Sequence, residues 1–379
     1  MALNLTRPQA RRIFVFGLCA AALSLASCQT GRRPVRPGPI VEPPPLITEQ
    51  NMVAVIVPLT GGDGPVGTSI SNAARLALAD TGEKSIKITV YDSTVPGGAA
   101  AATQRAIAEG NRLILGPLLA EDVRAAAPVA RKAGVPVIAF SNDEGVAGDG
   151  VYIMGFTPDQ SISRVVSFAR GKGASKFAAL VPTGLYGQRA AQAMIGSVRK
   201  FGGTVTGIQS YDRSKAAMTA AVRRLNAKGD VDAILIGDNG RIAAMAAPLL
   251  KVGPRKLGTE LWATDKTLGK TAALRGAWYA AAPDYQFNRL VTRYRARYGK
   301  TTYRLASLGY DAVLLAVRNA KSWPLGRAFP AKSLIDKDGF GGVDGAFRFS
   351  RDGVAERLLE VRQVTAAGTT TVAPAAPKF

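Results

Sequence analysis

The sequence lacks histidine entirely and has two cysteines, Cys19 and Cys28, among its 379 residues. Without histidine, a Ser-His-Asp or Cys-His nucleophile, a histidine general base and a histidine-ligated metal are all excluded. Because both cysteines precede residue 29, the rest of the chain has no thiol nucleophile, disulfide or thiolate metal site. We therefore expect no catalytic residue, no metal and no cofactor, since an enzyme built on this chain would depend on carboxylates, Lys, Tyr or Ser alone.

Acidic residues are also scarce. The chain has 49 Lys and Arg against 27 Asp and Glu, a formal net charge of +22 at pH 7, and 47% of its residues are apolar. This length and apolar content predict two domains, or one domain with two lobes, and a substantial core.

The first 27 residues have the composition of an export signal. Three arginines and no acidic residue precede the apolar run 13–25, which is too short to span a bilayer. The run ends in Leu25-Ala26-Ser27-Cys28, which resembles the lipobox at which bacterial lipoproteins are lipidated on Cys and cleaved before it. We expect residues 1–27 to be a signal peptide and Cys28 to carry lipid. Ordinary cleavage near Ala26, with an incidental thiol at Cys28, is the alternative.

Residues that follow Cys28 predict where the protein is anchored. An Asp after the lipidated Cys commonly retains bacterial lipoproteins in the inner membrane; Gln29 stands here, which implies the periplasmic face of the outer membrane. Residues 29–50 include six prolines and should form an extended tether that reaches roughly 65–70 Å. Residues 28–379 carry a net charge of +19, which favours anionic lipid or cell-wall polymer as a neighbour. We expect no nucleic-acid partner for an exported protein.

From residue 52 onward, apolar runs alternate with segments of helical periodicity. Candidate strands are 52–59, 87–92, 112–117, 136–141, 177–182, 204–211, 231–238 and 260–264. Candidate helices are 69–80, 99–109, 120–132, 158–170, 187–200, 216–227, 240–250, 284–298 and 304–320. Serial strand-helix-strand units of this kind predict a doubly wound, parallel α/β architecture. Segments 345–350 and 354–364 read as a hairpin, and residues 365–379 as a flexible tail.

Several of these segments carry a resemblance to a known family. These motifs are VAVIVPLTG, LILGP, AGVPVIAFS, ALVPTGLYGQRAAQAM and VDAILIGDNGRIAAMAAPLLK. In their kind and order, the chain resembles the type I periplasmic binding proteins of the leucine/isoleucine/valine group. The likeness covers residues 52–364. It implies two doubly wound α/β lobes joined by three crossovers near 155–158, 281–284 and 333–338, with a ligand cleft between them. Lobe 1 would comprise 51–156 plus 284–333, and lobe 2 157–283 plus 334–364.

The loops expected at this cleft depart from the family's amino-acid binders. Ligands of open α/β sheets lie at the carboxyl ends of the strands, which gives as candidate ligand or partner contacts Asp63, Glu121, Ser141, Asn142, Asp143, Tyr186, Asp238 and Asp265. The family holds the ligand carboxylate with Ser and Thr hydroxyls on the loops that correspond to 118–122 and 141–144, where this chain keeps only Ser141. Acids gathered there predict a cationic ligand or no small ligand. Asp and Glu also favour helix N-termini, which is the alternative explanation.

Residues 134–156 also resemble one subgroup, the penicillin-binding-protein activators. These are outer-membrane lipoproteins whose type I body docks on a peptidoglycan synthase and stimulates it, so the resemblance implies a penicillin-binding protein as partner. A candidate docking surface is the row Arg289, Arg293 and Arg297, spaced by four residues on a predicted helix. A solvated helix face is the alternative for this row.

Two functions are therefore open. The leading hypothesis is a non-enzymatic periplasmic lipoprotein that activates a peptidoglycan synthase. The alternative is the substrate-binding lipoprotein of an ABC importer for branched-chain or other amino acids. A serine penicillin-interactive enzyme is disfavoured, because Ser197-Val-Arg-Lys200 has no accompanying Lys-Thr-Gly.

Overall fold

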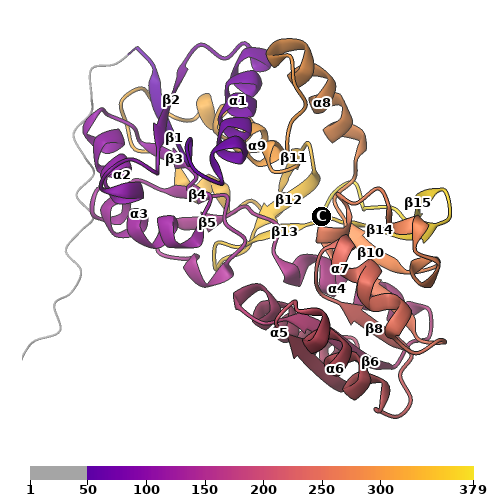
Figure 1. The fold of residues 1–379 in the computed structure, drawn as a ribbon. Helices are drawn as coiled ribbons and strands as arrows, with labels where there is room; N and C mark the ends of the chain where they lie inside the picture. Colours follow the sequence, from indigo (N-terminus) through magenta and orange to yellow (C-terminus); the bar gives the residue numbers. More distant parts are fainter. Residues whose placement is uncertain (1–48) are drawn as a thin grey trace, which may run out of the picture. The chain divides into compact units, whose positions relative to one another are not determined.

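The computed structural model describes residues 49–379, drawn in colour in Figure 1. The predicted signal peptide, Cys28 and the tether up to residue 48 lie outside the described residues. No helix among residues 49–379 has the length and apolar character needed to cross a membrane.

Lobe 1 is built on a parallel five-stranded sheet of order β2-β1-β3-β4-β5. Its strands are β1 (Asn51–Val57), β2 (Ile86–Asp92), β3 (Leu113–Leu115), β4 (Val137–Ala139) and β5 (Val151–Ile153). Its helices are α1 (Gly64–Thr81), α2 (Gly98–Ala108), α3 (Ala120–Lys132), α8 (Tyr285–Tyr298) and α9 (Ala306–Ala320). Although far apart in the sequence, α1 and α9 pack side by side (Figure 1).

The continuous apolar run of β1 is explained by burial on both faces. Val53, Val55 and Val57 point into a core with α1 and α9, whereas Ala54 and Ile56 point into a second core with α2 and α3. Side chains alternate across a strand, so a central parallel strand covered by helices on both sides has no solvent face.

Lobe 2 is built on a seven-stranded sheet of order β15-β14-β10-β9-β8-β6-β7. Its strands are β6 (Lys176–Pro182), β7 (Thr204–Tyr211), β8 (Ala233–Ile236), β9 (Arg255–Gly258), β10 (Trp278–Ala281), β14 (Glu360–Thr365) and β15 (Gly368–Ala373). Its helices are α4 (Pro158–Gly171), α5 (Leu185–Lys200), α6 (Lys215–Asn226) and α7 (Gly240–Ala246). Phe177, Ala179 and Val181 of β6 face α4 and α5, and Ala178 and Leu180 face α6 and α7.

The predicted fold class is confirmed: both lobes are doubly wound α/β units with mainly parallel sheets. The antiparallel pairs in lobe 2 are β10 with β14 and β14 with β15. The chain passes between the lobes three times. Its first two crossings fall between Met154 and Ile162 and between Ala282 and Leu290, where successive residues belong to the cores of different lobes.

The third crossing differs from its predicted place at 333–338. A small antiparallel sheet of β11 (Phe340–Gly342), β12 (Gly345–Phe349) and β13 (Ala355–Arg357) follows that segment and packs on lobe 1. Phe340, Phe347 and Phe349 are buried in the lobe 1 core, and Leu359 is the first residue of the lobe 2 core after them. Because these three rings are buried there, the chain stays on lobe 1 for about twenty residues beyond the predicted crossover.

Two further predictions were wrong. Residues 368–373, expected in a flexible tail, form β15 and pair with β14. Residues 260–264, expected as a strand, begin with a single 3₁₀ turn, Glu260–Trp262, and the strand is instead β9. The chain turns after Gly258 because the Trp262 ring packs onto it: a Cβ at Gly258 would lie 2.2 Å from a ring carbon. This turn places Glu260 at the carboxyl end of β9.

Candidate binding cleft

A cavity of about 520 Å³ lies at the carboxyl ends of strands from both lobes. Leu118 and Leu119 follow β3, Phe140 and Asn142 follow β4, and Glu260 follows β9. The other lining residues are Asp63, Val66, Phe156, Asn239, Leu261, Ala263, Thr264, Ala281, Ala282, Tyr303, Arg304 and Leu305. The surface of the wall is mostly apolar, and the polar side chains in it are Asp63, Asn142, Asn239, Glu260, Thr264, Tyr303 and Arg304.

Glu260 contributes a carboxyl group to this wall, although it was not among the contacts predicted from the sequence. Ser161 donates a hydrogen bond to its Oε2, and the Tyr186 hydroxyl donates one of 3.1 Å to its Oε1. The same Tyr186 hydroxyl is 3.1 Å from the Thr259 hydroxyl. Burial raises the pKa of Glu260 to about 7, although the hydrogen bonds from Ser161 and Tyr186 act in the opposite direction. Within residues 49–379 no Lys or Arg forms an ion pair with it, so its charge is uncompensated when it ionises.

Three of the predicted contacts lie at or next to this cavity. Asp63 and Asn142 line it directly, and Tyr186 reaches it through its hydrogen bond to Glu260. Asp63 precedes α1, but its side chain caps no amide of that helix. The cavity therefore has two carboxyl groups in its wall, Asp63 from lobe 1 and Glu260 from lobe 2.

The acids predicted on the 141–144 loop do not face the cavity as a cluster. Asp143 is 2% exposed and binds Arg124 Nη2 at 2.5 Å and Arg189 Nη2 at 2.9 Å. Burial alone would raise the pKa of Asp143, but the Gly145 amide and the two arginines together hold it below its usual value. Ser141 is buried, and its hydroxyl accepts a 3.1 Å hydrogen bond from the Asp143 amide. Arginine thus compensates the charge of Asp143, whereas burial raises the pKa of Glu144 on the same loop.

Glu121, Asp238 and Asp265 also lie outside the cavity lining. Glu121 is exposed in the first turn of α3. Asp238 is fully buried and accepts hydrogen bonds from Arg213 at 2.9 and 3.1 Å and from the Tyr211 hydroxyl at 2.8 Å. Asp265 accepts two 2.7 Å hydrogen bonds from Thr267. Asp238 thus ties the end of β8 to the end of β7, and Asp265 stabilises its own loop.

Arg304 is the basic side chain among the residues that line the cavity, and its charge is already compensated. Its Nη1 binds Asp284 at 2.5 Å and its Nη2 binds Asp344 at 2.6 Å. The guanidinium also stacks 4.2 Å from the centre of the Phe287 ring. A ligand carboxylate would have to compete with two protein carboxylates for this arginine.

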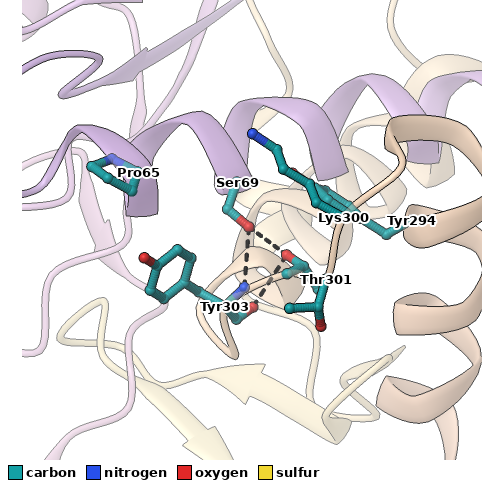
Figure 2. A pocket seen from close by; sticks show the side chains of 7 residues that line it. Pro65, Ser69, Tyr294, Lys300, Thr301 and Tyr303 are labelled. Atoms are coloured by element: carbon teal, nitrogen blue, oxygen red, sulfur yellow. Dashed lines mark hydrogen bonds between the residues drawn. The ribbon is translucent and has the colours of Figure 1, made fainter.

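A second hollow, of about 470 Å³, lies beside α1 in lobe 1. Figure 2 shows Ser69 of α1 facing the loop before α9, where its hydroxyl bonds that of Thr302 and accepts a 3.2 Å hydrogen bond from the Tyr303 amide. These contacts use the Ser69 hydroxyl to tie the loop to α1. We therefore place the candidate site in the cavity that contains Glu260.

The predicted basic row lies on α8. Arg289, Arg293 and Arg297 are exposed, whereas Leu290 and Tyr294 are buried against lobe 1. Arg293 forms an ion pair with Asp80 at 3.1 Å and stacks on the Tyr310 ring, so it also supports lobe 1.

Comparison with known proteins identifies the class to which this architecture belongs. The sequence model of the periplasmic binding protein family matches residues 52–369. The chain belongs to the periplasmic binding protein family, which confirms the resemblance drawn from its motifs. The activator subgroup is not addressed by this match and stays a prediction.

Solved structures show the same fold. A leucine binding protein of Thermotoga maritima is 22% identical, with a TM-score of 0.64 over 86% of this chain and 99% of that one. A putative branched-chain amino acid ABC transporter protein of Rhodospirillum rubrum is 20% identical, with a TM-score of 0.73 over 85% and 100%. A solute binding protein of an ABC transporter from Rhodopseudomonas palustris BisB5, in complex with 3,4-dihydroxybenzoic acid, is 20% identical, with a TM-score of 0.66 over 88% and 98%.

One curated relative is an uncharacterized protein of Rickettsia prowazekii (strain Madrid E). It is 25% identical over 179 residues, which are 47% of this chain and 48% of the relative. The match thus spans about half of each protein.

Proposed function

We propose that this protein is a non-enzymatic solute-binding protein of the periplasm, which captures a small molecule in the cavity between its lobes and delivers it to an importer. The observation that carries the proposal is the cavity itself, about 520 Å³ in volume, with a mostly apolar wall and the Glu260 carboxyl among its few polar groups. Ligand sites typically have 300–1,000 Å³ and this combination of apolar wall and sparse polar anchors.

The relatives support this function over the synthase activator. Their names describe leucine binding and binding of 3,4-dihydroxybenzoic acid by ABC transporter components. An anchor on Cys28 would hold the binding protein at the membrane, and residues 29–50, if extended as their proline content predicts, would let the body reach roughly 65–70 Å from it.

The test is calorimetric titration of the purified full-length protein with amino acids, amines and aromatic acids. We expect at least one compound to bind with a dissociation constant in the micromolar range or below. Absence of heat with every class would contradict the proposal.

A second candidate function is the activation of a peptidoglycan synthase. The observation in its favour is the exposure of Arg289 and Arg297 on α8, a basic surface that belongs to neither the core nor the cavity. In this function the protein would favour an active conformation of the synthase through contacts that differ between its two states.

A further inference from the structure

We propose that the cavity selects an organic cation with an apolar body and no carboxylate, such as a primary amine, over the corresponding zwitterionic amino acid. The inference rests on the proposed solute-binding function and names its ligand class. It follows from three features of the cavity wall: two carboxyls without cationic partners, an arginine that is already paired, and leucines, Leu118 and Leu119, on the loop after β3.

The carboxyls provide the attraction for a cation. Glu260 accepts hydrogen bonds from the hydroxyl groups of Ser161 and Tyr186 and from its own backbone amide, and forms no ion pair in the described chain. Asp63 lies in the opposite lobe's part of the wall, and its side chain caps no helix amide. An ammonium group bound to Glu260 would form charge-assisted hydrogen bonds in a partly dry site, where such bonds are strong, and Asp63 would add to the attraction.

A ligand carboxylate finds no comparable partner. Both terminal nitrogens of Arg304 already bind aspartates, at 2.5 Å to Asp284 and 2.6 Å to Asp344. On the loops after β3 and β4 the residues that reach the cavity are Leu118, Leu119, Phe140 and Asn142, while the Ser141 hydroxyl is buried in a bond with its own loop. The donors left for a ligand carboxylate are neutral side chains: Asn142, Asn239, Thr264 and Tyr303. A buried carboxylate that meets only neutral donors and nearby protein carboxylates is less stable than one paired with a cation, so a zwitterion would lose at this end part of what it gains at the other.

The rest of the wall accommodates an apolar body. Two phenyl rings, Phe140 and Phe156, come from the lobe 1 loop and the first crossover. Aliphatic side chains complete the surface: Val66, Leu118, Leu119, Leu261 and Leu305. Such a wall favours alkyl and aromatic groups by desolvation and imposes little orientation on them. Orientation would then come from the ammonium group alone.

The test compares matched ligand trios on the purified full-length protein by isothermal titration calorimetry. Each trio shares one apolar body: isopentylamine, leucine and 4-methylpentanoate; phenethylamine, phenylalanine and 3-phenylpropionate; tryptamine, tryptophan and indole-3-propionate. We expect the amine of at least one trio to bind at least tenfold more tightly than its amino acid, and the acid to bind most weakly.

Variants identify the groups responsible. Glu260→Gln should weaken amine binding at least tenfold, and Asp63→Asn should weaken it by a smaller factor, because Asp63 is the more exposed of the two. Glu121→Gln is the matched control, since it removes an equal charge from an exposed position outside the cavity lining, and it should leave the affinity within twofold.

The outcomes separate this inference from the function on which it rests. If an amino acid or an acid binds as tightly as its amine in every trio, the cation preference is wrong while the solute-binding function stands. If Glu260→Gln and Glu121→Gln have equal effects, the assigned anchor is wrong. If no trio and no other solute produces heat, the solute-binding function itself fails.

Discussion

Arg189 of α5 in lobe 2 donates a 2.9 Å hydrogen bond to Asp143 in lobe 1. Asp143 is almost fully buried and is bound on its other oxygen by Arg124 of its own lobe. If the lobes separate, Arg124 would stay with this carboxylate and Arg189 would leave it. The pair is a contact specific to the state in which the lobes are together.

Replacement of Arg189 should shift the protein towards open conformations. Arg189→Gln removes the charged partner from lobe 2 while Arg124 keeps Asp143 compensated, so the loss should be about 1–3 kcal/mol, the value of a hydrogen bond to a charged group. We expect the radius of gyration of the ligand-free protein to increase in small-angle X-ray scattering, and ligand affinity to fall about tenfold or more.

The control for this change is Arg131→Gln, which removes an exposed arginine paired with the exposed Asp149. Exposed pairs contribute about 0–1 kcal/mol, so the scattering curve and the affinity should match those of the wild type. An unchanged radius of gyration and affinity in Arg189→Gln would show that the lobes are held together without this pair.

Glu260 should make stability depend on pH. Its folded pKa of about 7 lies above the ordinary value of 4.5 because of burial. Because its pKa is raised, the folded state binds the proton more tightly than the unfolded state does, and protonation of Glu260 therefore stabilises the fold. This contribution to the free energy of unfolding is complete below pH 4.5 and is lost as pH rises through 7. Compared with Glu260→Gln, the wild type should lose about 1–3 kcal/mol of unfolding free energy between pH 5 and 8. Parallel stability profiles of the two proteins in urea would contradict this assignment.

The same group should give the affinity for amines the opposite dependence on pH. Only ionised Glu260 attracts an ammonium group, and its folded pKa of about 7 leaves it mostly protonated at pH 6. Affinity for the bound amine should rise about tenfold from pH 6 to pH 8, with release of a proton on binding below pH 7. Calorimetry in buffers of different ionisation enthalpy measures that proton, and a flat profile would argue against Glu260 as the anchor.

The periodicity of the sequence was sufficient for the fold class but not for the site. Continuous apolar runs identify strands such as β1 and β6 because burial on both faces leaves no room for polar residues. Periodicity does not show which side chains at the strand ends point into the cavity. Asp143 and Asp238 look like cleft residues by position, yet arginines from distant segments, Arg189 and Arg213, bind them.

Glu260 was missed because one strand was assigned to the wrong residues. ELWAT has the β-branched and aromatic residues of a strand, but packing of Trp262 onto Gly258 turns it into a 3₁₀ turn. The signal that could have revealed this is local: Thr259 directly follows the short run Arg255–Gly258, and a Thr before Glu is a common start of a helical turn. The contact between Trp262 and Gly258, four residues earlier, decides the matter, and periodicity does not contain it.

The basic surface on α8 provides a test of synthase activation. The double change Arg289→Glu and Arg297→Glu leaves Arg293 to its pair with Asp80, so the fold should be unaffected. If α8 contacts a synthase, affinity for that penicillin-binding protein in surface plasmon resonance should fall at least about tenfold. Lys215→Glu with Arg223→Glu is a matched control, because these exposed residues have the same spacing on α6. If both double variants lower the affinity equally, binding depends on the net charge of the protein and not on a specific contact with α8.

Arg304 should be among the strongest single contributors to stability, because it compensates a carboxylate with no exposure. Asp344 is 0% exposed and binds Arg304 at 2.6 Å, near the crossover that also holds Asp284. Arg304→Met leaves Asp344 buried with Arg357 as its remaining cationic neighbour, which should cost up to about 3–5 kcal/mol of unfolding free energy in urea titration. Arg105→Met, which breaks an exposed pair with Glu109, should cost less than about 1 kcal/mol.

A double variant distinguishes an uncompensated charge from lost packing. If the cost of Arg304→Met comes from the stranded charge of Asp344, then adding Asp344→Asn should recover much of the lost stability, because a neutral amide is far less costly to bury than an unpaired carboxylate. If the cost comes instead from the stacking of Arg304 on Phe287, the two changes should add and the double variant should be the least stable of all. A coupling energy near zero would therefore assign the role of Arg304 to packing.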